Sequence, residues 1–261
     1  MSHPAHGRFI WYDLNTTDPS AAKGFYNRLV GWGTQPFEGG GMPYTMWTVG
    51  SNPIGGVMEL PEEAKQAGAP PHWVAYVAVD DVAAISKRTV ELGGAELYPE
   101  TDIEGAGCFA VLQDPQGVPF AVYTSDQLST DAPEPPGVGH FSWHELASTD
   151  HRAGFEFYAD LFGWETMEDM DMGGGAMYRI FGRPGSFPLG GMYTTTADMP
   201  GPPMWLYYIS VPSVAEALPL VEELGGTVLN GPMEVPGGDT IAQCMDPQGA
   251  AFALHSKAAG D

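Results

Sequence analysis

The order of apolar and polar positions at the start of the chain predicts a strand, a helix and then short strands. Phe9 to Asn15 has the length and the bounding residues of a strand. The Asp18–Pro19 pair suits the N-cap and first position of a helix, whose apolar residues recur at three- and four-residue intervals until Gly31. Short strands are expected around Tyr44 to Thr48 and Ile54 to Leu60, between turn residues.

The same order of elements then repeats. Trp73 to Val79 reads as a strand, and Asp80 or Asp81 can cap a helix that two glycines end. Further strands are expected near residues 108–112 and 120–124. This part of the chain is therefore predicted to form two β-α-β-β-β modules, with one weak strand inferred in the first.

The second half of the chain repeats the first at a spacing of 132 residues. The segment "FYNRLVGW" (25–32) returns as "FYADLFGW" (157–164), and "DPQGVPFAVY" (114–123) returns as "DPQGAAFALH" (246–255). The opening "WYDLNTTD" likewise returns as "WHELASTD". A repeat this long indicates a duplicated domain rather than a solenoid.

The repeat predicts an α+β protein with two tandem domains. We place the first domain at residues 1–126 and the second at 140–261, joined by a Pro- and Gly-rich linker at 127–139. Pro219 falls inside the second helix of the second domain, so a kink or a late start is expected there.

Composition restricts the classes of partner. The chain has 33 acidic and 10 basic residues, a net charge of −23 and no run of Lys or Arg, so nucleic acids and anionic membranes are not expected partners. No apolar run approaches 18 residues, and Cys108 and Cys244 occupy non-equivalent positions in the repeat. We expect a cytoplasmic monomer or homodimer with inert thiols and a small-molecule ligand.

The repeated pattern resembles the vicinal oxygen chelate superfamily, which includes glyoxalase I, bleomycin-resistance proteins and extradiol dioxygenases. The resemblance depends on Asp18 before "FYNRLVGW", on the "VAVDDV" strand-to-helix join and on "DPQG" before the last strand, all of which recur in the second half. In detail it is similar to actinobacterial two-domain members labelled glyoxalase-like or hydroxylase-like antigens. The resemblance implies two glyoxalase-like domains, each an eight-stranded cup with its helices outside.

The resemblance also identifies where metal ligands would stand. Metal-using members place them on the first, fourth, fifth and eighth strands. The matching residues at three of these positions cannot bind a metal ion: Trp11 and Trp143 on the first strand, Val74 and Leu206 on the fifth, and Ala121 and Ala253 on the eighth. The fourth strand offers Glu59, and in the second copy Tyr193 or Thr194. We therefore expect no metal cofactor, with a divalent ion on relocated ligands as the alternative.

Alternation of side chains along a strand gives the expected cup lining. If Trp11 faces the first cup, then Phe9, Asp13 and Asn15 face it too. The remaining predicted lining residues are Phe141, Trp143, Glu145, Tyr76, Tyr123, Tyr208 and His255. Each cup would be lined by aromatic side chains and hold one carboxylate, as is typical of a small-molecule pocket.

The candidate site residues each have a second interpretation. Asp13 and Glu145 are candidate catalytic bases or ligand-binding carboxylates, and otherwise structural acceptors for an indole or backbone amides. Trp11 and Trp143 either stack on a ligand or pack the core. His255 is the histidine best placed for acid–base catalysis, and otherwise an interior imidazole with satisfied hydrogen bonds.

Two functions follow. The first is a metal-independent protein that binds a small aromatic or amphipathic molecule, in the manner of bleomycin-resistance proteins. The second is an enzyme, either a metal-free lyase, isomerase or hydroxylase-like catalyst that uses Asp13, Glu145 or His255, or a metalloenzyme with relocated ligands.

Overall fold

The computed structural model describes residues 3–39, 43–66, 68–126, 128, 136–196, 199 and 201–258. Most of the expected linker falls outside the described residues, and the domain boundaries stay a prediction. The first half contains β1 (Phe9–Thr16), α1 (Pro19–Val30), β2 (Gly33–Phe37), β3 (Tyr44–Val49), β4 (Asn52–Glu59), α2 (Glu62–Gln66), β5 (His72–Ala78), α3 (Val82–Glu91), β6 (Ala95–Ile103), β7 (Gly107–Gln113) and β8 (Pro119–Thr124).

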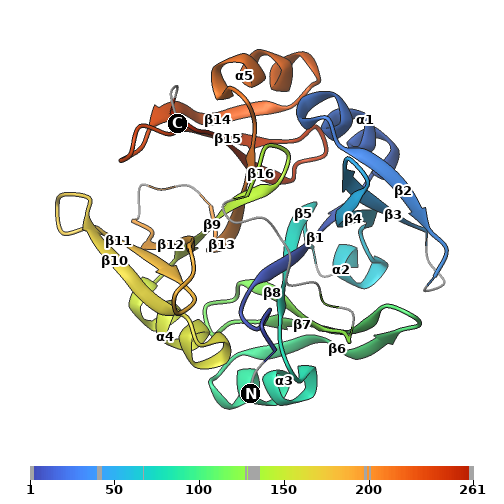
Figure 1. Ribbon diagram of the computed structural model, residues 1–261, viewed down its shortest axis with the longest axis vertical. Coiled ribbons are helices and arrows are strands. Elements are labelled where there is room, and N and C mark those ends of the chain that lie inside the picture. Colours follow the sequence, from blue (N-terminus) through green and yellow to red (C-terminus); the bar gives the residue numbers. More distant parts are fainter. Residues whose placement is uncertain are drawn as a thin grey trace. The chain divides into compact units, whose positions relative to one another are not determined.

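In its described residues the second half repeats this order without a counterpart of the short helix α2 (Figure 1). It contains β9 (Phe141–Ser148), α4 (His151–Phe162), β10 (Glu165–Asp171), β11 (Met177–Gly182), β12 (Pro188–Thr194), β13 (Met204–Ser210), α5 (Val214–Glu223), β14 (Thr227–Glu234), β15 (Thr240–Met245) and β16 (Ala251–Ser256). The expected β-α-β-β-β modules are confirmed.

Each half forms one curled eight-stranded sheet, so the predicted α+β fold class is confirmed. The strand order is β2-β3-β4-β1-β5-β8-β7-β6 in the first sheet and β10-β11-β12-β9-β13-β16-β15-β14 in the second. Within each module the first and last strands pair in parallel, as β1 does with β4 and β5 with β8, and the other neighbours are antiparallel. The parallel pairing follows from the helix that links each first strand to the rest of its module.

Helix starts and ends follow the predicted signals. The Asp18 carboxylate accepts hydrogen bonds from the backbone amides of Ser20 and Ala21, at 3.0 and 2.9 Å. Gly31 ends α1 in the left-handed conformation at φ 74°, where a glycine pays no steric cost. Asp150 caps α4 in the same way. These local signals explain why both helices begin and end where the sequence predicted.

The expectation for Pro219 is partly wrong. Helix α5 does not start late: it begins at Val214, which corresponds to the first residue of α3, and it includes Pro219. The N-cap Ser213 accepts a hydrogen bond from the Glu216 amide and sets this start. Buried residues on both sides of the proline, Val214 and Val221 among them, hold the helix on its sheet.

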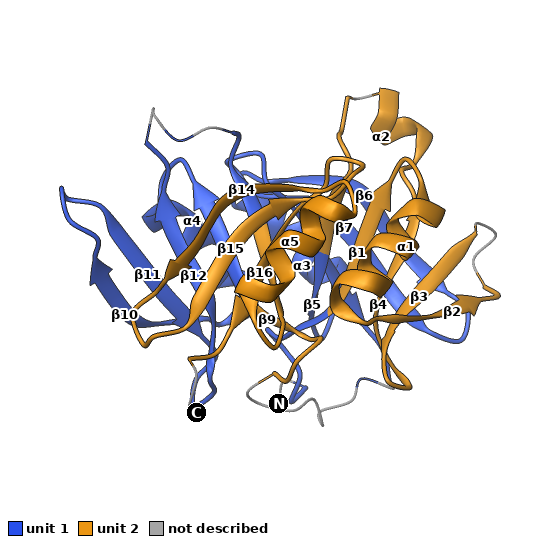
Figure 2. Ribbon diagram, turned by 90° about the horizontal axis from the view of Figure 1, so that it is seen from above, with its two compact units in different colours: residues 1–10, 75–134, 143–205 blue, residues 11–74, 135–142, 206–261 orange. Residues whose placement is uncertain are grey.

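The chain groups into two compact units, and each unit combines segments from both halves (Figure 2). Unit 1 comprises Met1–Ile10, Ala75–Glu134 and Trp143–Trp205, and unit 2 comprises Trp11–Val74, Pro135–Ser142 and Leu206–Asp261. Each unit therefore joins one β-α-β-β-β module of the first half to one module of the second half.

A buried Trp–Tyr–Asp relay joins the two modules inside each unit. In unit 2, the Trp73 indole donates to the Tyr26 hydroxyl at 3.1 Å, and this hydroxyl donates to Asp246 at 3.2 Å. The Asp246 carboxylate also accepts the backbone amides of Gln248 and Ala250 within its own DPQG turn. Burial raises the pKa values of Asp246 and Tyr26. The DPQG turn thus fixes an acceptor for a side chain of the other module.

The same relay recurs in unit 1. The Trp205 indole donates to the Tyr158 hydroxyl, which donates to Asp114, both at 3.1 Å. All three side chains are almost fully buried, so each hydrogen bond satisfies a group that has no access to water. We call these two groups of residues the core relays.

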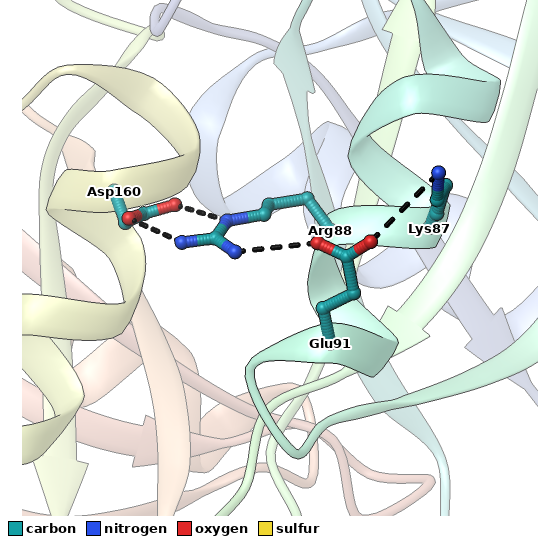
Figure 3. Close-up of polar contacts among 4 residues, drawn as sticks. All are labelled: Lys87, Arg88, Glu91 and Asp160. Carbon is teal, nitrogen blue, oxygen red and sulfur yellow. Dashed lines mark hydrogen bonds and ion pairs between the residues drawn. The ribbon is translucent and has the colours of Figure 1, made fainter.

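Exposed ion pairs add to the helix contact within unit 1. Arg88 of α3 forms a two-point pair with Asp160 of α4, with N–O distances of 2.7 and 2.8 Å (Figure 3). The same guanidinium contacts Glu91, which lies 3.9 Å from the Lys87 amine. Exposed pairs of this kind contribute little to stability, so the contact between modules depends more on buried groups such as the core relays.

Two further observations concern the whole described chain. No helix in its described parts has the length and apolarity that a membrane crossing requires.

Cys108 and Cys244 are both buried free thiols, and burial raises the pKa of each to about 12. A thiol with so high a pKa is a poor nucleophile, as the sequence predicted.

Candidate functional site

Trp11, Asp13 and Tyr44 form a hydrogen-bonded group in unit 2, which we call the Asp13 cluster. The Trp11 indole donates to Asp13 Oδ1 at 2.9 Å and approaches the Tyr44 hydroxyl oxygen at 2.7 Å. The Tyr44 hydroxyl donates to the same carboxylate oxygen at 2.6 Å. Asp13 is buried, whereas the two rings are half-buried. The cluster therefore places a desolvated carboxylate behind two partly accessible aromatic rings.

The local sequence explains why Tyr44 reaches Asp13. Asp13 of β1 pairs with Gly56 of β4, and Tyr44 lies on the neighbouring strand β3. A Cβ atom on Gly56 would lie only 2.0 Å from the Tyr44 hydroxyl oxygen. Only glycine leaves room for the tyrosine to cross the strand at this point.

Trp143, Glu145 and Tyr178 form the equivalent group in unit 1, the Glu145 cluster. The Trp143 indole donates to the Tyr178 hydroxyl at 2.8 Å, and this hydroxyl donates to Glu145 at 2.9 Å. Glu145 pairs with Gly191, where a Cβ atom would lie 2.1 Å from the Tyr178 ring. The repeat therefore builds the same arrangement twice, with a buried carboxylate and half-buried rings each time.

The tyrosines of the two clusters have different neighbours on the adjoining strand. Tyr178 pairs and stacks with Tyr193, with ring centroids 6.2 Å apart, whereas Tyr44 pairs with Met58. Burial, with the nearby Glu145 charge, raises the pKa of Tyr193 to about 12. The Glu145 cluster thus has one more phenol, which stays protonated at neutral pH.

Tyr44 and Tyr178 were missed by the sequence analysis. They are 134 residues apart rather than 132, because the stretch between the end of the preceding helix and the tyrosine is longer in the second half, where β10 has seven residues and β2 has five. The recurring "GG" of the fourth strand, Gly55–Gly56 and Gly190–Gly191, was the available signal. A glycine inside a strand often marks the close approach of another group.

Two of the predicted lining residues pack against aromatic rings outside the two clusters. Phe9 stacks on His144 with ring centroids 3.8 Å apart and packs against Trp164, and Phe141 stacks on Tyr12 at the same distance. Phe9 belongs to unit 1, but the rest of β1 from Trp11 onward belongs to unit 2. Alternation along the strand therefore does not bring Phe9 or Phe141 into either cluster, and their place in a cup lining stays a prediction.

The other tyrosine candidates lie on the second module of each sheet. In unit 1, the Tyr76 ring lies 6.0 Å from Phe109, and the Tyr123 hydroxyl donates to the Ala106 carbonyl at 2.8 Å. In unit 2, Tyr208 is only 2% exposed, which favours a packing role for its side chain.

Glu59 lies apart from the Asp13 cluster within unit 2. Its side chain is 68% exposed and forms an ion pair with Lys65 at 2.8 Å. Glu59 pairs with Thr16, and Thr194 pairs with Ser148, which is the equivalent of Thr16 in the second half. The strand register therefore makes Thr194 the counterpart of Glu59. This geometry gives no support to Glu59 as a pocket residue.

His255 lies between a serine and an aspartate in unit 2. Its Nδ1 atom lies 2.9 Å from the Ser142 hydroxyl, and its Nε2 atom lies 2.8 Å from Asp239. The side chain is 16% exposed. The predicted acid–base candidate therefore has two polar partners that the sequence analysis did not identify.

Comparison with known proteins agrees with the two-sheet architecture. The "Glyoxalase-like domain" family matches residues 10–123, and the "Glyoxalase/Bleomycin resistance protein/Dioxygenase superfamily" matches residues 137–254. The chain belongs to this superfamily. It is 33% identical to the putative glyoxylase CFP32 of Mycobacterium tuberculosis, across 94% of this chain and 92% of that protein. It is 29% identical to the anthracycline biosynthesis protein DnrV of Streptomyces peucetius, across 97% of this chain and 94% of that protein.

Solved structures of the superfamily show the same fold. The Mn(II)-bound glyoxalase from Novosphingobium aromaticivorans superposes with a TM-score of 0.62 at 18% identity, covering 98% of this chain and 83% of that one. The 2,2',3-trihydroxybiphenyl 1,2-dioxygenase of Sphingomonas wittichii gives a TM-score of 0.65 at 15% identity, covering 98% and 92%. At these identities the likeness concerns the fold alone.

Proposed function

We propose that this superfamily member binds a small aromatic or amphipathic molecule against its Trp–Tyr–carboxylate clusters and does so without a resident metal ion. The observation that carries the proposal is the recurrence of a buried carboxylate behind half-buried Trp and Tyr rings in both clusters. Aromatic faces bind planar ligands by stacking, and a desolvated carboxylate attracts a cation or a hydroxyl group.

The donor chemistry supports the metal-free part of the proposal. In the described residues, no three His, Cys, Asp or Glu side chains come together in a way that could hold a metal ion. In the Asp13 cluster the carboxylate oxygen accepts an indole N–H and a phenol O–H, and neither donor is a metal ligand at neutral pH. The residues present therefore do not fit the metal site of the superfamily, and no step of the proposal uses a metal.

The relatives support a role with small molecules. DnrV is named for anthracycline biosynthesis, and it aligns with nearly the whole of this chain. CFP32 is named a putative glyoxylase, which leaves enzymatic function as a second candidate. His255 favours this second candidate, because Asp239 and Ser142 hold its two ring nitrogens at hydrogen-bonding distance. A metal-free lyase, isomerase or hydroxylase-like enzyme would use such a group for proton transfer.

Tryptophan fluorescence tests the binding proposal. We expect 1,4-dihydroxyanthraquinone, a planar hydroxylated probe, to quench the emission saturably. The variants Trp11→Phe and Trp143→Phe should each lose part of the quenching, whereas Tyr98→Ala, which removes a ring that is 49% exposed outside both clusters, should not. Binding that persists unchanged in the double variant Trp11→Phe/Trp143→Phe would place the ligand elsewhere.

Elemental analysis of the purified protein tests the metal-free part. We expect no stoichiometric divalent ion and the same probe affinity before and after dialysis against a chelator. A bound divalent ion whose removal abolishes probe binding would contradict the proposal and favour relocated ligands.

A further inference from the structure

Ser142, His255 and Asp239 of unit 2 are arranged like a nucleophile, a base and an orienting acid. The Ser142 hydroxyl oxygen lies 2.9 Å from His255 Nδ1, and Asp239 Oδ2 lies 2.8 Å from His255 Nε2. Ser142 and His255 come from β9 and β16, and Asp239 directly precedes β15, so distant parts of the sequence assemble them. Both distances are in the range at which a base takes a proton from a nucleophile.

The carboxylate determines the tautomer of the imidazole. Asp239 can only accept a hydrogen bond when it is ionised, so His255 carries its proton on Nε2 and presents the lone pair of Nδ1 to Ser142. The Ser142 hydroxyl also approaches the Tyr208 carbonyl oxygen, but at 3.4 Å this contact is too long for a strong bond. Nδ1 is therefore the better acceptor for the hydroxyl proton.

The orienting acid is itself held in place. Its other oxygen, Asp239 Oδ1, accepts the backbone amide of Ala258 at 2.9 Å. The Asp239 and His255 side chains are 35% and 16% exposed, and Ser142 is half-buried. The group is thus ordered by hydrogen bonds and still in contact with solvent, which a reagent or substrate needs.

The first half of the chain lacks this arrangement altogether. At the spacing of the repeat, Ser142, Asp239 and His255 correspond to Ile10, Gly107 and Tyr123. None of these three can act as a nucleophile–base–acid set. At these positions only the second half carries the three chemical groups, and the fold itself does not require them.

We propose that Ser142 is a nucleophile that accepts an acyl group from a small carboxylic ester. Ser142 Oγ bonds to the ester carbonyl carbon while its proton passes to His255 Nδ1. The C–O bond to the alcohol then breaks, and the leaving alkoxide takes that proton. Water repeats the sequence on the acyl-serine, which releases the carboxylic acid and restores the Ser142 hydroxyl. Asp239 is a positioning residue that stabilises the imidazolium.

Covalent labelling tests the nucleophile directly. Diisopropyl fluorophosphate should form one adduct on Ser142, with loss of fluoride, as located by peptide mass spectrometry. Ser142→Ala should abolish this adduct. Ser125→Ala is the matched control, because Ser125 is equally half-buried but donates to the Ala106 carbonyl at 2.6 Å. The control should label like the wild-type protein.

Variants of the other two residues test their roles. We expect His255→Gln to slow labelling by about 100-fold and Asp239→Asn by about tenfold or more. Hydrolysis of 4-nitrophenyl acetate should fall in the same order, and the burst of nitrophenol seen with the wild-type protein should be absent from these two variants. The far-UV circular dichroism of each variant shows whether it is folded, and the half-exposed Asp239 position makes Asp239→Asn the safer variant.

Two results would overturn the inference. One is the absence of any adduct on Ser142 in the wild-type protein. The other is labelling of Ser142 at an unchanged rate in a folded Asp239→Asn or His255→Gln variant. Neither result bears on the proposed binding function, because the Asp13 and Glu145 clusters share no residue with this group.

Discussion

The molecule uses the combination of Trp, Tyr and carboxylate in two ways, and burial separates them. In the core relay of unit 2, Trp73, Tyr26 and Asp246 are at most 5% exposed. In the Asp13 cluster the carboxylate is buried to the same degree, but the Trp11 and Tyr44 rings are half-buried. The side chains of a fully buried relay have no surface left for a ligand, so we assign the relay a role in stability. The Asp13 cluster, whose rings stay partly in contact with solvent, retains surface for a ligand.

Unit 1 shows the same contrast. Its core relay contains Asp114 and Tyr158, whereas its Glu145 cluster contains Glu145 and Tyr178. The contrast predicts that changes in the core relays reduce stability and leave ligand binding intact, whereas changes in the clusters weaken ligand binding and have a smaller effect on stability.

The largest expected effect is on the free energy of unfolding of Asp246→Ala. The change leaves the Tyr26 hydroxyl and the amides of Gln248 and Ala250 without their acceptor inside the protein. At about 1–3 kcal/mol for each buried unsatisfied group, a loss of about 4 kcal/mol is expected in urea unfolding. Asp13→Ala should cost much less, because the Trp11 indole and the Tyr44 hydroxyl remain bonded to each other. Equal losses in the two variants would remove the distinction.

Acidification should produce the next largest effect. Burial lowers the pKa of His144 from 6.5 to about 4, where its ring stacks on Phe9 on the core side of β9. The unfolded chain binds this proton near pH 6.5, whereas the folded protein binds it only near pH 4. The contribution of His144 to the free energy of unfolding is therefore complete above pH 6.5 and is lost as the pH falls to 4. Its full size is about 3 kcal/mol.

His144→Tyr is the matched control for this titration, because the equivalent residue of the first half is Tyr12, which stacks on Phe141 in the same way. The difference in unfolding free energy between the variant and the wild-type protein should change between pH 7 and pH 4.5. A constant difference would show that His144 does not titrate on unfolding.

The sequence predicted local structure better than it predicted which distant side chains bond to one another. The helix starts at Asp18 and Asp150 could be read from the residues, because capping depends on neighbours in sequence. The fold came from the resemblance, and the pairing of modules into units could not be read from the sequence. Tyr44 lies 31 residues from Asp13, and Ser142 lies 113 residues from His255. Contacts over such separations depend on strand register, which only the structure supplies.

Binding should distinguish the clusters from the core relays at the level of a factor of ten. Asp13→Asn and Glu145→Gln each remove a buried charge without changing the side-chain shape, and we expect about tenfold weaker binding of the anthraquinone probe at the affected cluster, or about 1.4 kcal/mol. Tyr158→Phe, in the core relay of unit 1, should leave the affinity unchanged and lower the stability instead. If Tyr158→Phe weakens binding as much as the cluster variants do, the core relays are not purely structural. A loss in only one cluster variant would identify the cluster that binds.

The smallest expected effect separates the two clusters from each other. In the Asp13 cluster the indole bonds directly to the carboxylate at 2.9 Å, so Tyr44→Phe leaves Trp11 with an acceptor. In the Glu145 cluster the indole donates to the Tyr178 hydroxyl, so Tyr178→Phe removes the acceptor of Trp143. Tyr178→Phe should therefore cost about 0.5 kcal/mol more unfolding free energy than Tyr44→Phe. Paired urea titrations of the two variants measure this difference, and a larger loss in Tyr44→Phe would show that the direct Trp11–Asp13 bond does not compensate for the missing hydroxyl.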